Sequence, residues 1–345
     1  MKSVLVYGFL SLLYFPLRGQ SCAMLDAEKE DPQMRIGIAA FATMAVASGH
    51  LLGQVFIGEV KSGSLYTQLN QSDVPHGTVV VGVALSEGLV LAADSRIVTT
   101  GNAGFYRVIS DHTSKLFDIG NIGVAWYGQA FLQGRSLGGW LSDYKARKPT
   151  GDVDHLADAI SAYLATPYDS QYPVQGPPPG SPTTPPTTDA RPLLGLYVAG
   201  YDTNGVGKIL RIEFPNGRKP TEAFSTRRTG AVWSGEIDVI SRLILGYDGR
   251  IRNTLPFQNM QPELSAATNR QLAGLQYNIP FDALMMQDGI DFASSLVRIT
   301  VEMQRFSHGT IADSSDIPGV GGSVDILAIT PFEIQWISRK RLDSH

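Results

Sequence analysis

The hydrophobic pattern is clearest between residues 78 and 130. Residues 78–85 and 89–93 are apolar runs separated by the turn residues Ser86-Glu87-Gly88. Two β-rich runs on either side of a glycine-containing turn predict a hairpin whose strands are both largely buried. Residues 110–130 repeat this design around Gly120-Asn121, so a second hairpin is expected there.

The period then changes to the helical one. Apolar positions from Phe131 to Tyr144 predict a helix that ends near Lys148-Pro149. Asp152 is a suitable cap for a second helix, which Pro167 is expected to end. Strands are then expected at 193–202 and 208–214, a strand and a helix at 231–248, a long helix whose first turn contains Pro280, and strands at 323–330 and 332–337. Strands and helices segregated in this way predict an antiparallel α+β domain.

The segment 166–192 contains the run PVQGPPPGSPTTPPTT. A segment of this composition does not pack a core, so we expect an extended or disordered proline-rich loop. Two interpretations remain for it: a docking segment for a partner, or a surface insertion that the fold tolerates.

The N-terminal part contains two signal-like segments. Residues 1–33 hold a long apolar run and a cleavage-like Ser21-Cys22-Ala23, and residues 34–53 begin at Met34 and contain Ala45-Val46-Ala47. Two signals in series make little sense, so we interpret 1–33 as a dispensable extension and 34–53 as the signal peptide. A membrane anchor at residues 36–56 is the alternative for the second segment. Residues 54–77 are then expected to be a propeptide.

Export to the periplasm or the extracellular space follows if a signal segment is real, and a cytoplasmic location follows if the whole extension is a gene-model artefact. The chain has 345 residues, a net charge of −4 and one cysteine, Cys22. The mild negative charge gives no reason to expect nucleic acid as a partner. A single cysteine excludes disulfides within the chain and cysteine-based metal sites. The six histidines have no metal-ligand spacing, so neither a metal nor another cofactor is expected.

Charged residues occur where the pattern predicts burial. Asp94 and Arg96 directly follow a buried strand, and Lys115 stands among apolar residues in the second hairpin. Because an unpaired charge is costly to bury, Asp94 and Lys115 are expected to pair with each other. Such a pair is either structural or part of an active site.

The ordered set of these motifs resembles the proteasome β-subunit family, a branch of the N-terminal-nucleophile hydrolases. The motifs are Gly77-Thr78 before a strand, AADSR at 92–96, TSKLF at 113–117 and the step to Gly128. The resemblance covers residues 76–130 and continues more weakly to about residue 337. It implies a four-layer αββα sandwich over residues 78–340, a threonine peptidase, and a homo-oligomer or ring assembly.

The chemistry of Thr78 sets a condition on the amino terminus. A threonine hydroxyl is a poor nucleophile until a base takes its proton, and the residue's own α-amine is one such base. Thr78 must then be the first residue, so cleavage of the Gly77–Thr78 bond is predicted, and the resemblance implies that this cleavage is autocatalytic. A buried Lys115 ammonium lowers the amine pKa by like-charge repulsion, and Asp94 holds the lysine.

The resemblance also implies roles for three further positions. The backbone N–H of Gly128 would bind the oxyanion, and Ser234 and Asp316 would lie beside the amine. Asp313 competes with Asp316 for the last role. The loop from Arg96 to Thr113 is longer than is usual in the family, which puts the register of Lys115 in question.

The resemblance further implies a specificity pocket whose residues are uncharged. They are Ile97, Thr113, Phe117, Trp126 and Ala130. A large Trp126 predicts a preference for small or medium apolar residues before the scissile bond, unless its ring turns into the core.

Three functions follow from these residues. A threonine peptidase acting on a peptide or protein substrate is the first. An amidohydrolase that cleaves a small amide shares the nucleophile, and a silent structural subunit keeps only the fold. The sequence contains neither a GxSxG nucleophile elbow nor a P-loop.

Overall fold

A computed structural model describes residues 77–100, 106–174, 189, 191–307, 309–310, 313–314 and 318–339. The expectations for residues 1–33, 34–53 and 54–76 lie outside the described residues. Among the helices of the described part, none is long and apolar enough to cross a membrane.

The first sheet has five antiparallel strands in the order β12-β1-β2-β15-β16. It contains the first predicted hairpin, in which Val80 of β1 lies opposite Ala93 of β2. On the other side of β1, Val80 lies opposite Ser234 of β12. The strands are β1 (Val79–Ala84), β2 (Leu89–Asp94), β12 (Gly230–Gly235), β15 (Val324–Ile329) and β16 (Ile334–Ser338).

The second sheet is also antiparallel, in the order β11-β10-β9-β6-β5. It contains the second predicted hairpin and one strand, β11, that the hydrophobic pattern did not predict. Its strands are β5 (Leu116–Ile119), β6 (Ile122–Gly128), β9 (Leu194–Tyr201), β10 (Gly207–Phe214) and β11 (Gly217–Ser225). Short pairs are formed by β3 (Ile97–Thr100) with β4 (Tyr106–Ser110), β7 (Phe131–Leu132) with β8 (Arg135–Ser136), and β13 (Gly309–Thr310) with β14 (Asp313–Ser314).

Side-chain caps begin two of the helices. The Ser136 hydroxyl accepts from the Gly139 N–H at the start of α2, and the Asp152 carboxylate accepts from the His155 N–H at the start of α3. The helices are α2 (Leu137–Ala146), α3 (Val153–Gln171), α4 (Asp238–Leu245), α5 (Leu255–Gln258), α6 (Pro262–Ala273) and α7 (Met286–Phe306), with a 3₁₀ turn η1 (Gly249–Asn253).

Two helix boundaries differ from the prediction. Helix α3 does not end at Pro167 but continues to Gln171, so the first residues of the predicted loop 166–192 are helical. Its last turn is held by Tyr168, which is fully buried and donates its hydroxyl to the Pro192 carbonyl at 2.5 Å. Helix α7 begins at Met286, later than predicted, where the Asp288 carboxylate accepts from the Met285 N–H at 2.9 Å.

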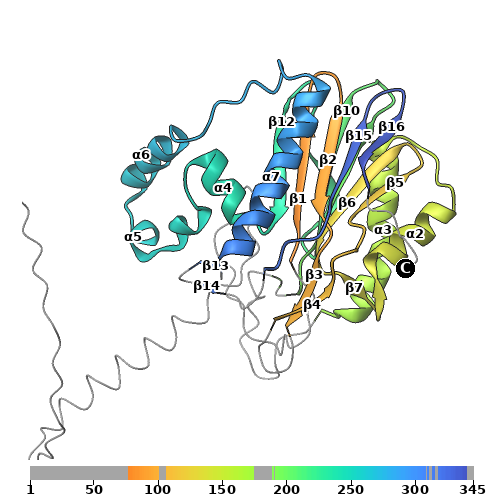
Figure 1. Ribbon diagram of the computed structural model, residues 1–345, viewed down its shortest axis with the longest axis horizontal. Helices are drawn as coiled ribbons and strands as arrows, with labels where there is room; N and C mark the ends of the chain where they lie inside the picture. The colour runs from red at the N-terminus through yellow and green to blue at the C-terminus, as the bar shows by residue number, and fades with distance from the viewer. Residues whose placement is uncertain are drawn as a thin grey trace, which may run out of the picture. The chain divides into compact units, whose positions relative to one another are not determined.

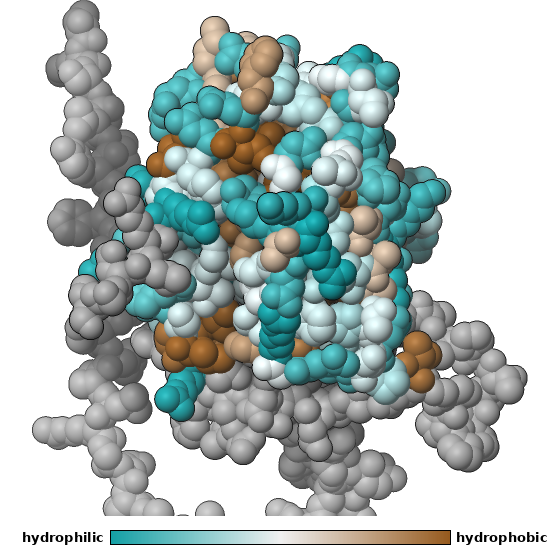
Figure 2. Space-filling model, turned by 90° about the vertical axis from the view of Figure 1, so that its right-hand side faces the viewer, coloured by the Kyte–Doolittle hydropathy of each residue, from teal (hydrophilic) through white to brown (hydrophobic). Residues whose placement is uncertain are grey.

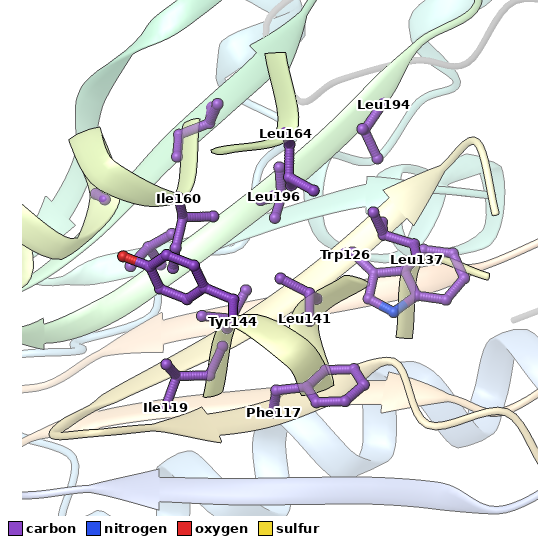
Figure 3. Packing of buried hydrophobic residues seen from close by; sticks show 14 of the residues in the cluster. Phe117, Ile119, Trp126, Leu137, Leu141, Tyr144, Ile160, Leu164, Leu194 and Leu196 are labelled. Carbon is purple, nitrogen blue, oxygen red and sulfur yellow. The ribbon is translucent and has the colours of Figure 1, made fainter. Parts of the chain in front are cut away.

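Three buried hydrophobic clusters hold these elements together. Figure 1 shows α7 lying over β1 and β2 of the first sheet, and α2 and α3 on the side of β5 and β6 of the second sheet. One cluster joins α2 and α3 to the second sheet and includes Trp126, Leu137 and Leu164 (Figure 3). A second joins α4 and α7 to the first sheet, and the third is built from side chains of both sheets. The predicted α+β class with antiparallel sheets is confirmed.

The outer surface on the α2 and α3 side is mostly hydrophilic, with small separate hydrophobic patches (Figure 2). Both helices therefore place apolar residues against the sheet and polar residues outside, as their predicted amphipathic pattern requires.

Candidate active site at the Gly77–Thr78 bond

Thr78 directly precedes β1, and its side chain and backbone are both held. The residue is 4% exposed, and its Oγ1 donates a hydrogen bond to the Gly77 carbonyl oxygen at 2.6 Å. Its own carbonyl accepts from the Glu236 N–H at 2.7 Å. A Cβ at Gly235, where φ is +94°, would overlap that same carbonyl. The Thr78 hydroxyl is thus fixed beside the peptide bond that precedes it.

Gly77 has a conformation that only glycine adopts without strain. Its φ is +88°, and an added Cβ would overlap the carbonyl oxygen of Gly319. The glycine therefore permits both the left-handed turn of the chain and its close approach to the loop before β15.

We expect Gly77→Ala to slow cleavage of the Gly77–Thr78 bond by about 100-fold, because the bond is displaced from the hydroxyl. The half-time of cleavage, followed by intact mass, measures this. Gly205→Ala is the matched control, because Gly205 also has a positive φ of +72°. A Cβ added at Gly205 would meet open space, so this substitution carries the backbone strain without the overlap. A Gly77→Ala chain that is cut at the wild-type rate would contradict the assignment.

Asp94 and Lys115 form the expected ion pair, and both side chains are fully buried. Lys115 Nζ lies 2.8 Å from Asp94 Oδ1. The carboxylate also accepts from three backbone N–H groups: Val79 at 2.9 Å, Arg96 at 3.1 Å and Gly321 at 3.0 Å. A buried charge with this many donors is well satisfied, so Asp94 is a rigid anchor for the lysine.

Lys115 also contacts the peptide bond before Thr78. Its Nζ donates to the Gly77 carbonyl oxygen at 3.0 Å, so this oxygen accepts from both the ammonium and the Thr78 hydroxyl. Burial lowers the pKa of Lys115, and the charge and hydrogen bond of Asp94 oppose that effect. An ammonium in this position polarises the carbonyl and would stabilise negative charge on its oxygen.

Of the three other predicted site residues, the structure describes Gly128 and Ser234 but not Asp316. Gly128 ends β6 with φ +82°, and a Cβ there would overlap the Leu193 carbonyl oxygen. Ser234 is fully buried, and its hydroxyl lies 2.6 Å from the hydroxyl of Tyr197. Asp316 lies outside the described residues. The competing Asp313 is described only as part of β14.

Four of the five predicted pocket residues lie in the hydrophobic cluster that joins α2 and α3 to the second sheet, and Figure 3 labels two of them, Phe117 and Trp126. Ile97, Phe117, Trp126 and Ala130 are each at most 9% exposed. The Trp126 ring is turned into this cluster and its Nε1 donates to the Ser114 carbonyl at 3.3 Å. The backbone N–H of Thr113 donates to the Ser95 carbonyl at 3.0 Å. These positions are filled by their own side chains.

The loop before β15 contributes residues that the sequence did not identify. Besides the Gly321 contact with Asp94, Ser323 N–H donates to the Ser95 hydroxyl at 2.8 Å. Arg96 lies beside the same loop and forms an ion pair with Asp111, its Nη2 donating to Oδ2 at 3.1 Å. The GVGG run at 319–322 is the sequence signal that could have identified this loop, because consecutive glycines allow the backbone to approach closely. Within the described ranges, no group of three or more His, Cys, Asp or Glu could hold a metal ion.

Comparison with solved structures finds Anbu proteins, the ancestral β-subunits. Anbu from Yersinia bercovieri is 14% identical with a TM-score of 0.40, and the match covers 75% of this chain and 87% of that one. An Anbu Gly-1 mutant from Hyphomicrobium sp. strain MC1 is 11% identical with a TM-score of 0.41, over 75% of this chain and 85% of that one. A likeness at this level says nothing about activity. No family model matches the sequence, and no curated protein matches it.

The assignment to the proteasome β-subunit family is therefore wrong. No model of any family matches, and the structures found are those of proteasome-like but distinct proteins. The resemblance depends on short motifs within residues 76–130, and such motifs describe a local site rather than a family.

Proposed function

We propose that the chain is an N-terminal-nucleophile hydrolase that cuts its own Gly77–Thr78 bond and then cleaves peptide bonds with Thr78. One observation carries this proposal: the Gly77 carbonyl oxygen accepts from the Thr78 hydroxyl at 2.6 Å and from the buried Lys115 ammonium at 3.0 Å. An ordinary strand threonine has no need of a buried ammonium on the preceding carbonyl, since burying that charge is costly.

In the processing step, Thr78 Oγ1 attacks the carbonyl carbon of Gly77 and its proton passes to water. The Lys115 ammonium stabilises the resulting oxyanion. The bond between the Gly77 carbon and the Thr78 nitrogen then breaks, and the nitrogen takes up a proton. Water hydrolyses the ester left between Gly77 and Thr78, which gives a Gly77 carboxylate and a free Thr78 amine.

Processing creates the base for turnover. The new α-amine has a reference pKa of about 8 and can take the Thr78 hydroxyl proton as Oγ1 attacks a substrate carbonyl. The amine then returns the proton to the leaving amine, and water releases the acyl group by the same route. Lys115 no longer has the Gly77 carbonyl as partner, so its Nζ can stabilise the deprotonated Thr78 oxygen while Gly128 N–H binds the substrate oxyanion.

The fold proposed for this chemistry is a four-layer αββα sandwich. The three clusters support it, because one lies between each pair of neighbouring layers that such a sandwich contains. Thr78 then lies at the end of a central strand, on the face that looks toward the other sheet.

A specificity prediction follows from Trp126. Because the Trp126 ring is turned into the hydrophobic cluster, we expect Trp126→Ala to leave the preference for the residue before the scissile bond unchanged. The lost packing should also cost about 3–5 kcal/mol of stability. Fluorogenic tripeptide amides varied only in the last residue measure the preference, and thermal unfolding measures the stability.

Trp140→Ala is the control for that change, because Trp140 packs on the edge of the same cluster and its Nε1 donates to the Leu132 carbonyl at 3.1 Å. Both variants should lose stability without changing the preference. A gain of cleavage after Phe or Leu in Trp126→Ala alone would contradict this position of the indole. Efficient wild-type cleavage after Arg or Asp would contradict the predicted pocket.

The experiment that tests the function combines N-terminal sequencing of the purified chain with hydrolysis of the tripeptide amides. We expect a chain that starts at Thr78 and cleaves them. A chain that starts at Thr78 but cleaves only small acyl amides would point to an amidohydrolase. An uncut, inactive chain would contradict the proposal and favour a structural subunit.

A further inference from the structure

A tyrosine, a glycine and a glutamate stand in one row across the second sheet. Tyr127 of β6 lies opposite Gly195 of β9, and Gly195 lies opposite Glu213 of β10. A Cβ on Gly195 would overlap the Tyr127 ring, so the glycine lets the ring lie across its strand. The Tyr127 hydroxyl thereby reaches Glu213 Oε1 and donates to it at 2.8 Å.

A second tyrosine connects this row to the first sheet. Tyr197 lies two positions after Gly195, and its ring centroid is 5.4 Å from that of Tyr127. Its hydroxyl is 2.6 Å from the Ser234 hydroxyl, and the two form a hydrogen bond. Tyr127, Tyr197 and Ser234 are each 0% exposed. The Tyr127–Glu213 and Tyr197–Ser234 hydrogen bonds, joined by the contact between the two tyrosine rings, thus form a chain through the core between the sheets.

The inner end of this chain lies near Thr78. Ser234 is opposite Val80, and Thr78 is two positions before Val80, so Thr78 and Ser234 are diagonal neighbours on one face of the sheet. Diagonal neighbours of this kind are about 7–8 Å apart. Ser234 therefore lies on the same face as Thr78, one diagonal step from the residue whose amino group processing creates.

At the outer end of the chain, the Tyr127 hydroxyl donates to the Glu213 carboxyl group. The Tyr127 oxygen keeps its lone pairs for a neighbouring donor. Burial raises the pKa of both Tyr127 and Tyr197, which keeps them as neutral phenols that donate and accept without acting as bases. Either hydroxyl of the Tyr197–Ser234 pair can donate, and when Ser234 donates to Tyr197 it keeps its lone pairs for another donor.

We infer that Tyr197, supported by Tyr127 and Glu213, is a positioning residue that orients the Ser234 oxygen to accept an N–H from the processed Thr78 amine. This inference rests on the proposed function. With one N–H bound to Ser234, the amine directs its lone pair to the Thr78 hydroxyl. Without Tyr197, the Ser234 hydroxyl can rotate, donate to that lone pair and compete with the nucleophile.

The charged groups of this part of the core come from two strands and a loop. Glu213 and Arg211 belong to β10, Asp94 ends β2, and Lys115 directly precedes β5. None of them is changed by a Tyr197→Phe substitution, so the substitution removes one hydroxyl from an otherwise constant electrostatic field.

The test compares Tyr197→Phe with Tyr168→Phe, using the tripeptide amides over a range of pH. Tyr168 is the matched control because it is equally buried and its hydroxyl bonds to Pro192, away from Thr78. We expect Tyr197→Phe to lower kcat about tenfold with KM unchanged. The acid limb of the kcat/KM profile should move to lower pH. The Ser234 oxygen, which stabilises the charged Thr78 amine by accepting its N–H, is no longer oriented by Tyr197, so the pKa of the amine falls. Tyr168→Phe should change neither quantity.

Glu213→Gln is the second variant, used if Tyr197→Phe does not fold. An amide can donate as well as accept, so the hydrogen bond from Tyr127 is no longer held in one direction. We expect the same lower kcat and the same shift of the acid limb. A wild-type kcat and pH profile in the folded variant would overturn the inference, as would equal changes in Tyr168→Phe. If wild type is processed and active, only the inference falls. If wild type starts upstream of Thr78 and cleaves nothing, the proposed function falls with it.

Discussion

Thr78→Ala is expected to leave the Gly77–Thr78 bond intact and to lower peptide hydrolysis by a factor on the order of 10⁴ or more, because the only attacking atom is removed. Thr78→Ser keeps a hydroxyl, so it should retain part of both activities. Serine lacks the methyl group that restricts the threonine rotamer, so its oxygen should be less well placed beside the carbonyl and processing should be slower.

N-terminal sequencing and intact mass measure whether the Gly77–Thr78 bond is cut. Peptide hydrolysis is measured on chains released directly at residue 78 from a fusion partner, so that lost processing is not mistaken for lost turnover. A normal cut before residue 78 in Thr78→Ala would mean that another protease performs the processing. Full hydrolysis by the released Thr78→Ala chain would remove Thr78 from the mechanism.

Lys115→Met should abolish turnover even in a chain released directly at Thr78. The methionine fills a similar volume but removes the ammonium that contacts Asp94 and the Gly77 carbonyl. Leaving Asp94 buried without its partner should also cost about 3–5 kcal/mol of stability. Lys115→Arg should restore little activity, because a planar guanidinium does not fit the point contacts made by Nζ.

The double variant Lys115→Met with Asp94→Asn separates these two effects. Removing both charges should recover part of the lost stability and none of the activity, since an isolated buried carboxylate is no longer present. Thermal unfolding and hydrolysis of the tripeptide amides are measured on the same samples. Wild-type hydrolysis by Lys115→Met would contradict its role, and recovered activity in the double variant would mean that the pair is only structural.

The sequence predicts what short-range patterns determine. Both hairpins follow from apolar runs around glycine turns, and the Asp94–Lys115 pair follows from the cost of burying either charge alone. The start of α3 is predicted because Asp152 caps it locally. These features need no knowledge of distant parts of the chain.

Features that depend on distant contacts are not predicted. Helix α3 passes Pro167 because Tyr168 is held by packing and by Pro192, and α6 has no buried residue to mark it in a hydrophobic pattern. Asp94 accepts from Gly321, which is 227 positions away. The row of Tyr127, Gly195 and Glu213 depends on strand register, and a one-residue slip would remove it.

The central claim is that Thr78 cuts the peptide bond before itself. The most direct measurement is the intact mass of the purified wild-type chain over time, at two protein concentrations and in a mixture with the Thr78→Ala chain. We expect a product that starts at Thr78, a half-time of cleavage that does not depend on protein concentration, and an uncut Thr78→Ala chain in the mixture. A stable wild-type chain, or a Thr78→Ala chain cut before residue 78, would contradict it.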